Sequence, residues 1–117
     1  EGFEIHGQKE GAVMTVEFRL NGQPFTALNG GPVFTFNEAV SFQVFCDTQE
    51  EIDFYWFRLS QGGEEGPCGW LKDRYGVSWQ IVPSILAELM SDPARAGRVT
   101  KAFMQMKKMD IEILKQA

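Results

Sequence analysis

The sequence predicts an α+β protein in which strands come first and helices last. Apolar and polar residues alternate over 12–20, 40–46 and 77–82, which is the pattern of strands with one buried face. Capping residues followed by apolar positions at helical spacing mark 48–61 and the last third of the chain. With 117 residues, 44% of them hydrophobic, the chain is long enough to form one packed domain.

Residues 12–29 are expected to form a β-hairpin, preceded over 1–11 by a short edge strand or an irregular start. Asn21-Gly22 is the strongest short turn signal, because both positions of a tight hairpin turn require positive φ. A two-residue turn also fixes the register. The expected pairs on the apolar side are Leu20 with Gln23, Phe18 with Phe25, and Val16 with Ala27.

The segment from 40 to 82 is expected to be a β-α-β-β unit, or β-α-β-β-β if the acidic loop 63–67 contains a short strand. After the strand 40–46, Thr48 and Glu51 form a capping box that starts a helix, and Gly62-Gly63 ends it. The helix is predicted to bury Ile52, Tyr55, Trp56 and Leu59. The strands CGWLK and VSWQIV follow, joined by a tight DRYG turn.

Residues 84–117 are expected to be helical. Ser84, Asp92 and Asp110 are the predicted N-caps of three helices, and Pro93 suits a first turn. Val99, Phe103 and Met106 give the middle helix an apolar stripe. Four methionines suit an adaptable contact, so these helices are expected to cover the sheet or to contact a second subunit: Met90, Met104, Met106 and Met109.

The charge balance argues against nucleic acid as a partner. There are 16 acidic and 11 basic side chains, for a net charge of −5, and no basic cluster is long enough to follow a phosphate backbone. No apolar run reaches the roughly 20 residues of a membrane span. Two cysteines make neither a disulfide framework nor a zinc motif, and no signal peptide is visible. We therefore expect a reduced, cytoplasmic protein.

Four stretches together resemble one bacterial family: TVEFRLNGQPFTALNGGP, SFQVFCDTQEEIDFYW, GGEEGPCGWLKDRYGVSWQIVP and MKKMDIEIL. This is the PhnB-like family, whose domain is often called 3-demethylubiquinone-9 3-methyltransferase. It belongs to the glyoxalase/bleomycin-resistance, or vicinal oxygen chelate, superfamily. The resemblance covers about residues 11 to 114, and the CGWLKD-YG-SWQIVP string is its most specific part.

The resemblance implies paired β-α-β-β-β modules that form a curled mixed sheet around a cleft, with C-terminal helices in addition. It also implies a homodimer. The first module lacks its opening strand and helix here, which we interpret as an incomplete record of the chain. The expected organisation is one domain, 1–117, made of three parts: 1–31 as the remainder of the first module, 38–83 as the second module, and 84–117 as the helical extension.

Enzymes of this superfamily hold a divalent metal with His and Glu side chains, and the metal acts as a Lewis acid. The matching positions here are Ser41 and Gln80, which offer a neutral hydroxyl and a neutral amide. The single histidine, His6, lies in the weak amino-terminal segment and is interpreted as an exposed imidazole. We therefore expect no metal ligands and no cofactor. A metal-dependent lyase, isomerase or dioxygenase remains the alternative, with ligands on the missing strand.

The methyltransferase description finds less support in the residues. S-adenosylmethionine is usually bound by a glycine-rich turn between a strand and a helix, whereas Gly30-Gly31 precedes no helix. The other candidate functional residues are better explained by packing or by exposure to solvent. Cys68 has no basic neighbour and is expected to be buried packing. Glu64 and Glu65 are expected to be solvated in their loop.

Strand alternation leaves neutral hydrogen-bonding groups beside apolar ones on the cleft side, which is the composition of a small-molecule pocket. Trp70 is expected either to line this pocket or to lie at a dimer contact. No catalytic residue can be named. The predicted function is small-molecule binding, for which bleomycin-binding relatives provide the precedent of sequestration. The candidate ligand-binding residues are Ser41, Gln43, Phe45, Trp70, Ser78 and Gln80.

Overall fold

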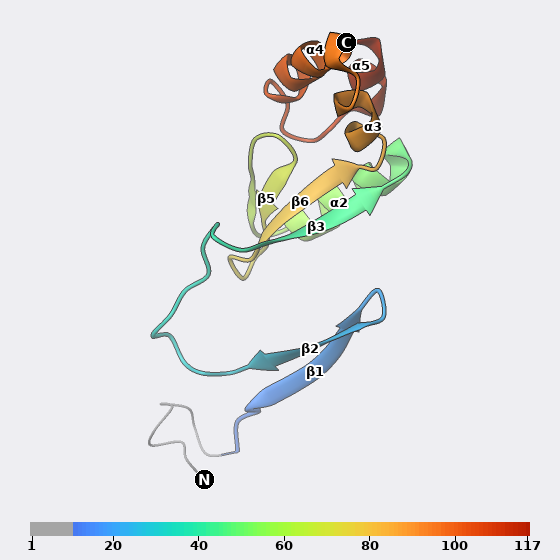
Figure 1. Ribbon diagram of the computed structural model, residues 1–117. Coiled ribbons are helices and arrows are strands. Elements are labelled where there is room, and N and C mark those ends of the chain that lie inside the picture. The colour runs from blue at the N-terminus through green and yellow to red at the C-terminus, as the bar shows by residue number, and fades with distance from the viewer. Residues whose placement is uncertain (1–10) are drawn as a thin grey trace. The chain divides into compact units, whose positions relative to one another are not determined.

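A computed structural model describes residues 11–117 and shows an α+β protein with two separate sheets. The chain divides into two compact units, Glu1–Thr35 and Phe36–Ala117 (Figure 1). The mixed fold class is as predicted, and neither sheet closes into a barrel. His6 and most of the expected edge strand or irregular start over 1–11 lie outside the described residues. No helix within 11–117 is long and apolar enough to cross a membrane.

The first unit contains the predicted hairpin, made of β1 (Thr15–Leu20) and β2 (Gln23–Leu28). Asn21 and Gly22 both have positive φ, 50° and 81°, as a two-residue turn with the twist of the strands requires. All three predicted pairs are confirmed, and the rings of Phe18 and Phe25 stack with centroids 5.6 Å apart. Many apolar side chains of the hairpin are exposed, among them Val16, Phe18 and Leu20.

The second unit contains a four-stranded sheet in the order β3-β6-β5-β4. Its strands are β3 (Ser41–Cys46), β4 (Glu64–Glu65), β5 (Trp70–Lys72) and β6 (Ser78–Pro83). The strands β3 and β6 are parallel, and the other neighbours are antiparallel. The acidic loop does contain a short strand, so the unit is β-α-β-β-β.

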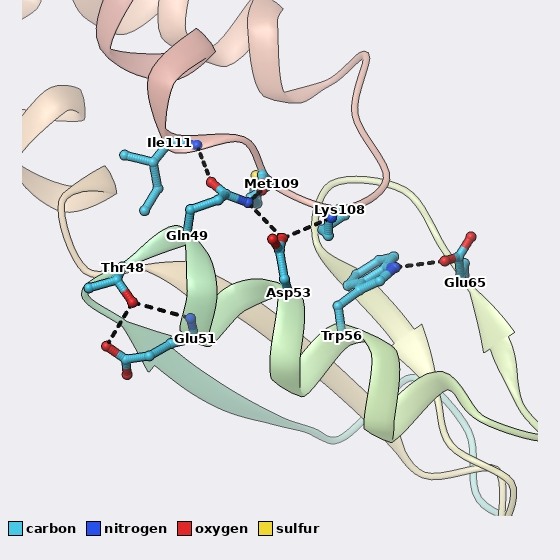
Figure 2. A network of polar contacts seen from close by, with 9 residues as sticks. All are labelled: Thr48, Gln49, Glu51, Asp53, Trp56, Glu65, Lys108, Met109 and Ile111. Carbon is cyan, nitrogen blue, oxygen red and sulfur yellow. Dashed lines mark hydrogen bonds and ion pairs between the residues drawn. The ribbon is translucent and has the colours of Figure 1, made fainter.

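The helix α2 (Gln49–Ser60) covers one face of this sheet (Figure 1). Thr48 caps it as predicted: its hydroxyl accepts a hydrogen bond from the Glu51 backbone N–H at 3.2 Å and lies 3.3 Å from the Glu51 carboxylate (Figure 2). The helix buries Ile52 and Trp56 against Leu71 and Ile81 of the sheet. Burying four such side chains supplies most of the driving force for this packing, at about 1.5–3 kcal/mol for each one.

Three further helices lie beyond the carboxyl ends of β3 and β6 (Figure 1). They are α3 (Leu86–Met90), α4 (Pro93–Phe103) and α5 (Ile111–Gln116). The side chains of Asp92 and Asp110 accept hydrogen bonds from Ala94 N–H and Ile113 N–H, both at 3.0 Å, so two of the three predicted caps are confirmed. These helices complete the core with Leu89, Val99, Met109 and Leu114.

Ser84 and Tyr55 of this unit do not take their predicted roles. Ser84 does not cap α3, because its hydroxyl is used by the chain before α2, donating to the Asp47 carboxylate at 2.5 Å. Tyr55 does not belong to the core. It is 38% exposed and packs edge-on against Phe54, because the buried stripe of α2 is narrower than its aromatic content suggested.

Candidate functional site

The two faces of the four-stranded sheet differ in chemistry. Cys46, Leu71 and Ile81 point to the helix face and are almost fully buried. Alternation along the strands, with the observed register, directs a second set of side chains to the opposite face. We call this second face the open face, because no helix of residues 36–117 lies on it (Figure 1). It carries Ser41, Gln43, Phe45, Trp70, Lys72, Ser78, Gln80 and Val82.

Neutral amides and a hydroxyl form a short network on the open face. Ser41 lies beside Ser78, and Gln43 beside Gln80, across the parallel pair β3-β6. The Gln80 amide Nε2 donates to the Ser41 hydroxyl at 2.8 Å, and its Oε1 accepts from Gln43 Nε2 at 3.4 Å. The network holds the Gln80 amide in one orientation and leaves hydrogen-bonding capacity on Gln43 and Ser41.

Apolar groups flank this network. Phe45 follows Gln43 on β3 and is 62% exposed. Trp70 is the register partner of Gln80 on the other side, on β5, and is half-buried. Ser78 differs from its neighbours because it is buried, and nothing among the described residues hydrogen-bonds to its hydroxyl. The structure thus brings all six sequence-predicted residues to one face of one sheet, in adjacent strands.

A cavity of about 520 Å³ opens at the β4 edge of the sheet. Trp70 is the single sequence-predicted residue among those that line it. The sequence interpretation did not find this cavity, because it depends on the two-residue strand β4 folding back along β5. The remaining lining residues are Glu38, Glu64, Glu65, Gly66, Pro67, Leu71 and Lys72.

The charged groups of this cavity are held by specific partners. Lys72 forms an ion pair with Glu38, and this contact holds the pKa of the Glu38 carboxyl below its usual value and raises the pKa of Lys72. Glu65 accepts a hydrogen bond of 2.7 Å from the indole N–H of the buried Trp56 (Figure 2). Glu65 is exposed, as expected of a solvated loop residue, but its carboxylate also has this partner in the core, which the sequence did not predict. Glu64 lies opposite Lys72 in the β4-β5 ladder.

A second set of contacts ties residues 106–111, which we call the C-terminal segment, to α2 (Figure 2). Gln49 donates to the Met109 carbonyl and to the Asp53 carboxylate, both at 3.0 Å, and accepts from the Ile111 N–H at 2.9 Å. Lys108 pairs with Asp53 at 2.8 Å, and this contact is the main cause of a lowered Asp53 pKa. These bonds fix the segment across the end of the core.

The same segment also supports the turn that precedes β5. Cys68 N–H donates to the Met106 carbonyl and Gly69 N–H to the Lys107 carbonyl, both at 2.8 Å. Cys68 itself has a positive φ of 57° and is half-buried, with its sulfur 3.6 Å from that of Met104. The expectation of a buried Cys68 is thus wrong, because the turn places the thiol at the margin of the core. The C-terminal segment in this way positions one wall of the cavity.

The donors at the positions that the resemblance relates to metal binding do not fit a metal centre. The Ser41 hydroxyl and the Gln80 amide are neutral and are hydrogen-bonded to each other. Divalent metals in such sites require several imidazole or carboxylate ligands that converge on one point. Within residues 11–117, no three His, Cys, Asp or Glu side chains converge in this way.

Comparisons with known proteins match the chain to one family. The family described as 3-demethylubiquinone-9 3-methyltransferase matches residues 2–82. Among solved structures, a PhnB protein from Bacillus cereus is 40% identical, with a TM-score of 0.57, and the match covers 65% of this chain and 68% of the other. No curated protein matches the chain. The family match ends within β6, the last strand, before α3.

Proposed function

We propose that this chain, which belongs to the PhnB-like 3-demethylubiquinone-9 3-methyltransferase family, is a small-molecule-binding protein. We place its ligand on the open face of the second sheet. The observation that carries this proposal is the Gln80-Ser41-Gln43 network, in which an oriented amide lies between the exposed ring of Phe45 and the indole of Trp70. A few oriented polar groups among apolar ones are typical of pockets for small organic molecules.

The chemistry of this face favours a neutral, flat ligand with both a donor and an acceptor. Gln43, Gln80 and Ser41 can each donate and accept, and none of them carries a charge. Flat apolar parts of a ligand can lie against Phe45 and Trp70. The described residues of this face include neither a nucleophile with an adjacent base nor a set of metal ligands. Binding without chemistry is therefore the function that these residues support best.

We also propose that the two units are modules of a glyoxalase/bleomycin-resistance fold and that the protein is a homodimer. The second unit has the β-α-β-β-β order that this fold requires. The hairpin β1-β2 exposes Val16, Phe18 and Leu20, and a two-stranded hairpin is at best marginally stable in water. A further protein surface over this hairpin would stabilise it. Analytical ultracentrifugation that shows a monomer at micromolar concentration would contradict the dimer.

Benzamide is a suitable probe of the open face, because it is flat, neutral and has an amide group. In a titration followed by NMR, we expect backbone shifts at Ser41, Gln43 and Gln80. Replacing Gln80→Ala removes the central amide and should weaken binding about fivefold or more, the equivalent of one hydrogen bond. Gln116→Ala, which removes an amide on α5, serves as the control and should leave the affinity unchanged. Shifts confined to other parts of the chain would contradict the proposal.

The description of the matching family supplies a second candidate function, methyl transfer. An S-adenosylmethionine-dependent enzyme must bind that cofactor at micromolar to millimolar concentration. Calorimetry with S-adenosylmethionine separates the two candidates. The binding proposal predicts no heat of binding at about 1 mM cofactor, the upper end of that range. Saturable binding with a stoichiometry near one would favour methyl transfer instead.

A further inference from the structure

We propose that Glu38 is a specificity determinant of the open face: by pairing with Lys72, it keeps anionic ligands off this face. The inference rests on the proposed function and deepens it, because it gives a reason why the ligand is neutral. Among the described side chains that strand alternation directs to this face, Lys72 is the one that is positively charged. Whether the face attracts an anion therefore depends on what holds this ammonium group.

The ion pair lies across the amino end of β6. Glu38 precedes β3, Lys72 is on β5, and β6 lies between these two strands. The chain before β3 also approaches the turn before β6, because a Cβ added at Gly76 would lie 3.9 Å from the Cβ of Phe36. Ser78 is the register partner of Lys72 and is 1% exposed, whereas the next residue of β6 on the same face is only half-buried. The pair thus covers one end of the open face.

Without Glu38, this end of the face would suit an acidic group. The hydroxyl of Ser78 has no hydrogen-bond partner among the described residues, and it lies in the strand next to the Lys72 ammonium. A carboxylate can accept hydrogen bonds from both kinds of donor. Glu38 supplies such a carboxylate from the chain itself, so the charge of Lys72 is compensated before a ligand binds.

Glu64 acts on the same ammonium group from the β4 side. It is the register partner of Lys72, so both side chains lie on one side of the sheet. The contact with Glu38 is the main cause of the raised pKa of Lys72, and the charge of Glu64 makes a smaller contribution. Two carboxylates thus flank one ammonium, and an anion on this face meets an excess of negative charge. Because Glu38 is in direct contact, its removal should change selectivity more than removal of Glu64.

Lys72 is close enough to act on a ligand held by Gln80. Trp70, the register partner of Gln80, is two residues away from Lys72 on β5, which corresponds to about 7 Å along the strand. The long, flexible side chain of lysine can cover most of this distance. An ammonium group released from Glu38 can therefore pair with an acidic substituent of a ligand that lies against Trp70.

Benzamide and benzoate test this inference, because they have the same shape and differ in charge. For the unaltered chain, a titration followed by NMR should show weaker binding of benzoate than of benzamide. Glu38→Gln should raise the affinity for benzoate relative to benzamide about twofold to fivefold, the range expected for an exposed ion pair. Damage to the face would weaken the binding of both probes instead. The gain should vanish at about 1 M salt, where charges are screened within about 3 Å.

Three further variants separate the freed ammonium from other effects. In Glu38→Gln/Lys72→Gln the ammonium is also removed, so the affinity ratio should return to that of the unaltered chain. Glu64→Gln should raise the ratio less than Glu38→Gln does. Glu88→Gln makes the same change in net charge on α3, away from the sheet, and should leave the ratio unchanged.

The two proposals fail in different ways. An unchanged ratio in Glu38→Gln, or a gain that persists in the double variant, would overturn the role of Glu38. The proposed function would then stand if benzamide still shifts the signals of Ser41, Gln43 and Gln80. If neither probe shifts these signals, the proposed function is wrong, and the role of Glu38 fails with it.

Discussion

Gln80 on β6 donates a hydrogen bond of 2.8 Å to the hydroxyl of Ser41 on the neighbouring parallel strand β3. The bond uses one of the two N–H donors of the Gln80 amide and one lone pair of the Ser41 hydroxyl. The pair also keeps an uncharged, oriented amide in the middle of the open face. In our account, this face recognises a small molecule by hydrogen bonds and flat apolar contact.

Replacing Gln49→Ala should lower the free energy of unfolding by about 1–3 kcal/mol, the range for buried hydrogen-bonding groups left without a partner. The Gln49 side chain makes three hydrogen bonds that tie α2 to Met109 and Ile111. Urea denaturation measures the loss. The control is Gln116→Ala, which removes a single exposed contact with Glu112 and should cost less than about 0.5 kcal/mol. Equal losses would contradict the role of Gln49.

The ion pair between Asp53 and Lys108 should make stability dependent on acid pH. The pKa of Asp53 is lowered in the folded state, first by the Lys108 hydrogen bond and then by Gln49. The contribution of Asp53 to the free energy of unfolding is therefore fully present above its unfolded-state pKa of about 3.9. It is lost as the pH falls through the lower folded-state pKa. Asp53→Asn should cost about 0.5 kcal/mol at pH 7, as exposed pairs do, and nothing at about pH 2. A difference that stays constant between these pH values would contradict the prediction.

The two cysteines should differ strongly in reactivity. Burial, helped by the charges of Glu51 and Asp47, raises the pKa of Cys46 to about 11, whereas Cys68 is half-buried at a turn. With iodoacetamide at about pH 8, mass spectrometry should find Cys68 modified first and Cys46 modified only after unfolding. Because the folded state keeps the Cys46 proton longer, stability should also fall as the pH rises from about 8.5 towards 11. In the Cys68→Ser variant, no cysteine should be modified rapidly. Rapid modification of Cys46 in that variant would contradict the burial of Cys46.

Removing residues 92–117 should expose the core and cause aggregation. The deleted segment contributes Val99, Met109 and Leu114, all of them buried. A milder version is Leu114→Ala, which should cost about 2–5 kcal/mol through the cavity that it creates. Size-exclusion chromatography and urea denaturation measure the two effects. A truncated protein that elutes at the same oligomeric size as the full chain would show that these helices are dispensable.

Local signals predicted much of the fold. Asn21-Gly22, Thr48, Asp92 and Asp110 each act on neighbouring backbone groups, so their roles can be read from adjacent residues, and all four are confirmed. Ser84 shows the limit of such reasoning. Its hydroxyl had a local cap available but bonds instead to Asp47, 37 positions earlier in the chain. A competition between near and distant partners is decided by tertiary structure.

One part of the candidate site could be predicted from local pattern, and another part depends on tertiary structure. Alternation along the strands predicted that Ser41, Gln43, Ser78 and Gln80 share a face, because side-chain direction in a strand has a period of two. The cavity at β4 could not be predicted, because Trp56 reaches Glu65 only after α2 has packed on the sheet. Glu64 and Glu65, which lie between Gly63 and Gly66, are apparent in the sequence, but two glutamates between glycines are also typical of a solvated loop.

The crystal structure of the protein with benzamide tests the central claim most directly. We predict ligand density on the open face, with the benzamide amide hydrogen-bonded to Gln80 or Gln43 and its ring against Phe45 or Trp70. Density for a cation coordinated by Ser41 and Gln80, or benzamide bound only away from this face, would contradict it.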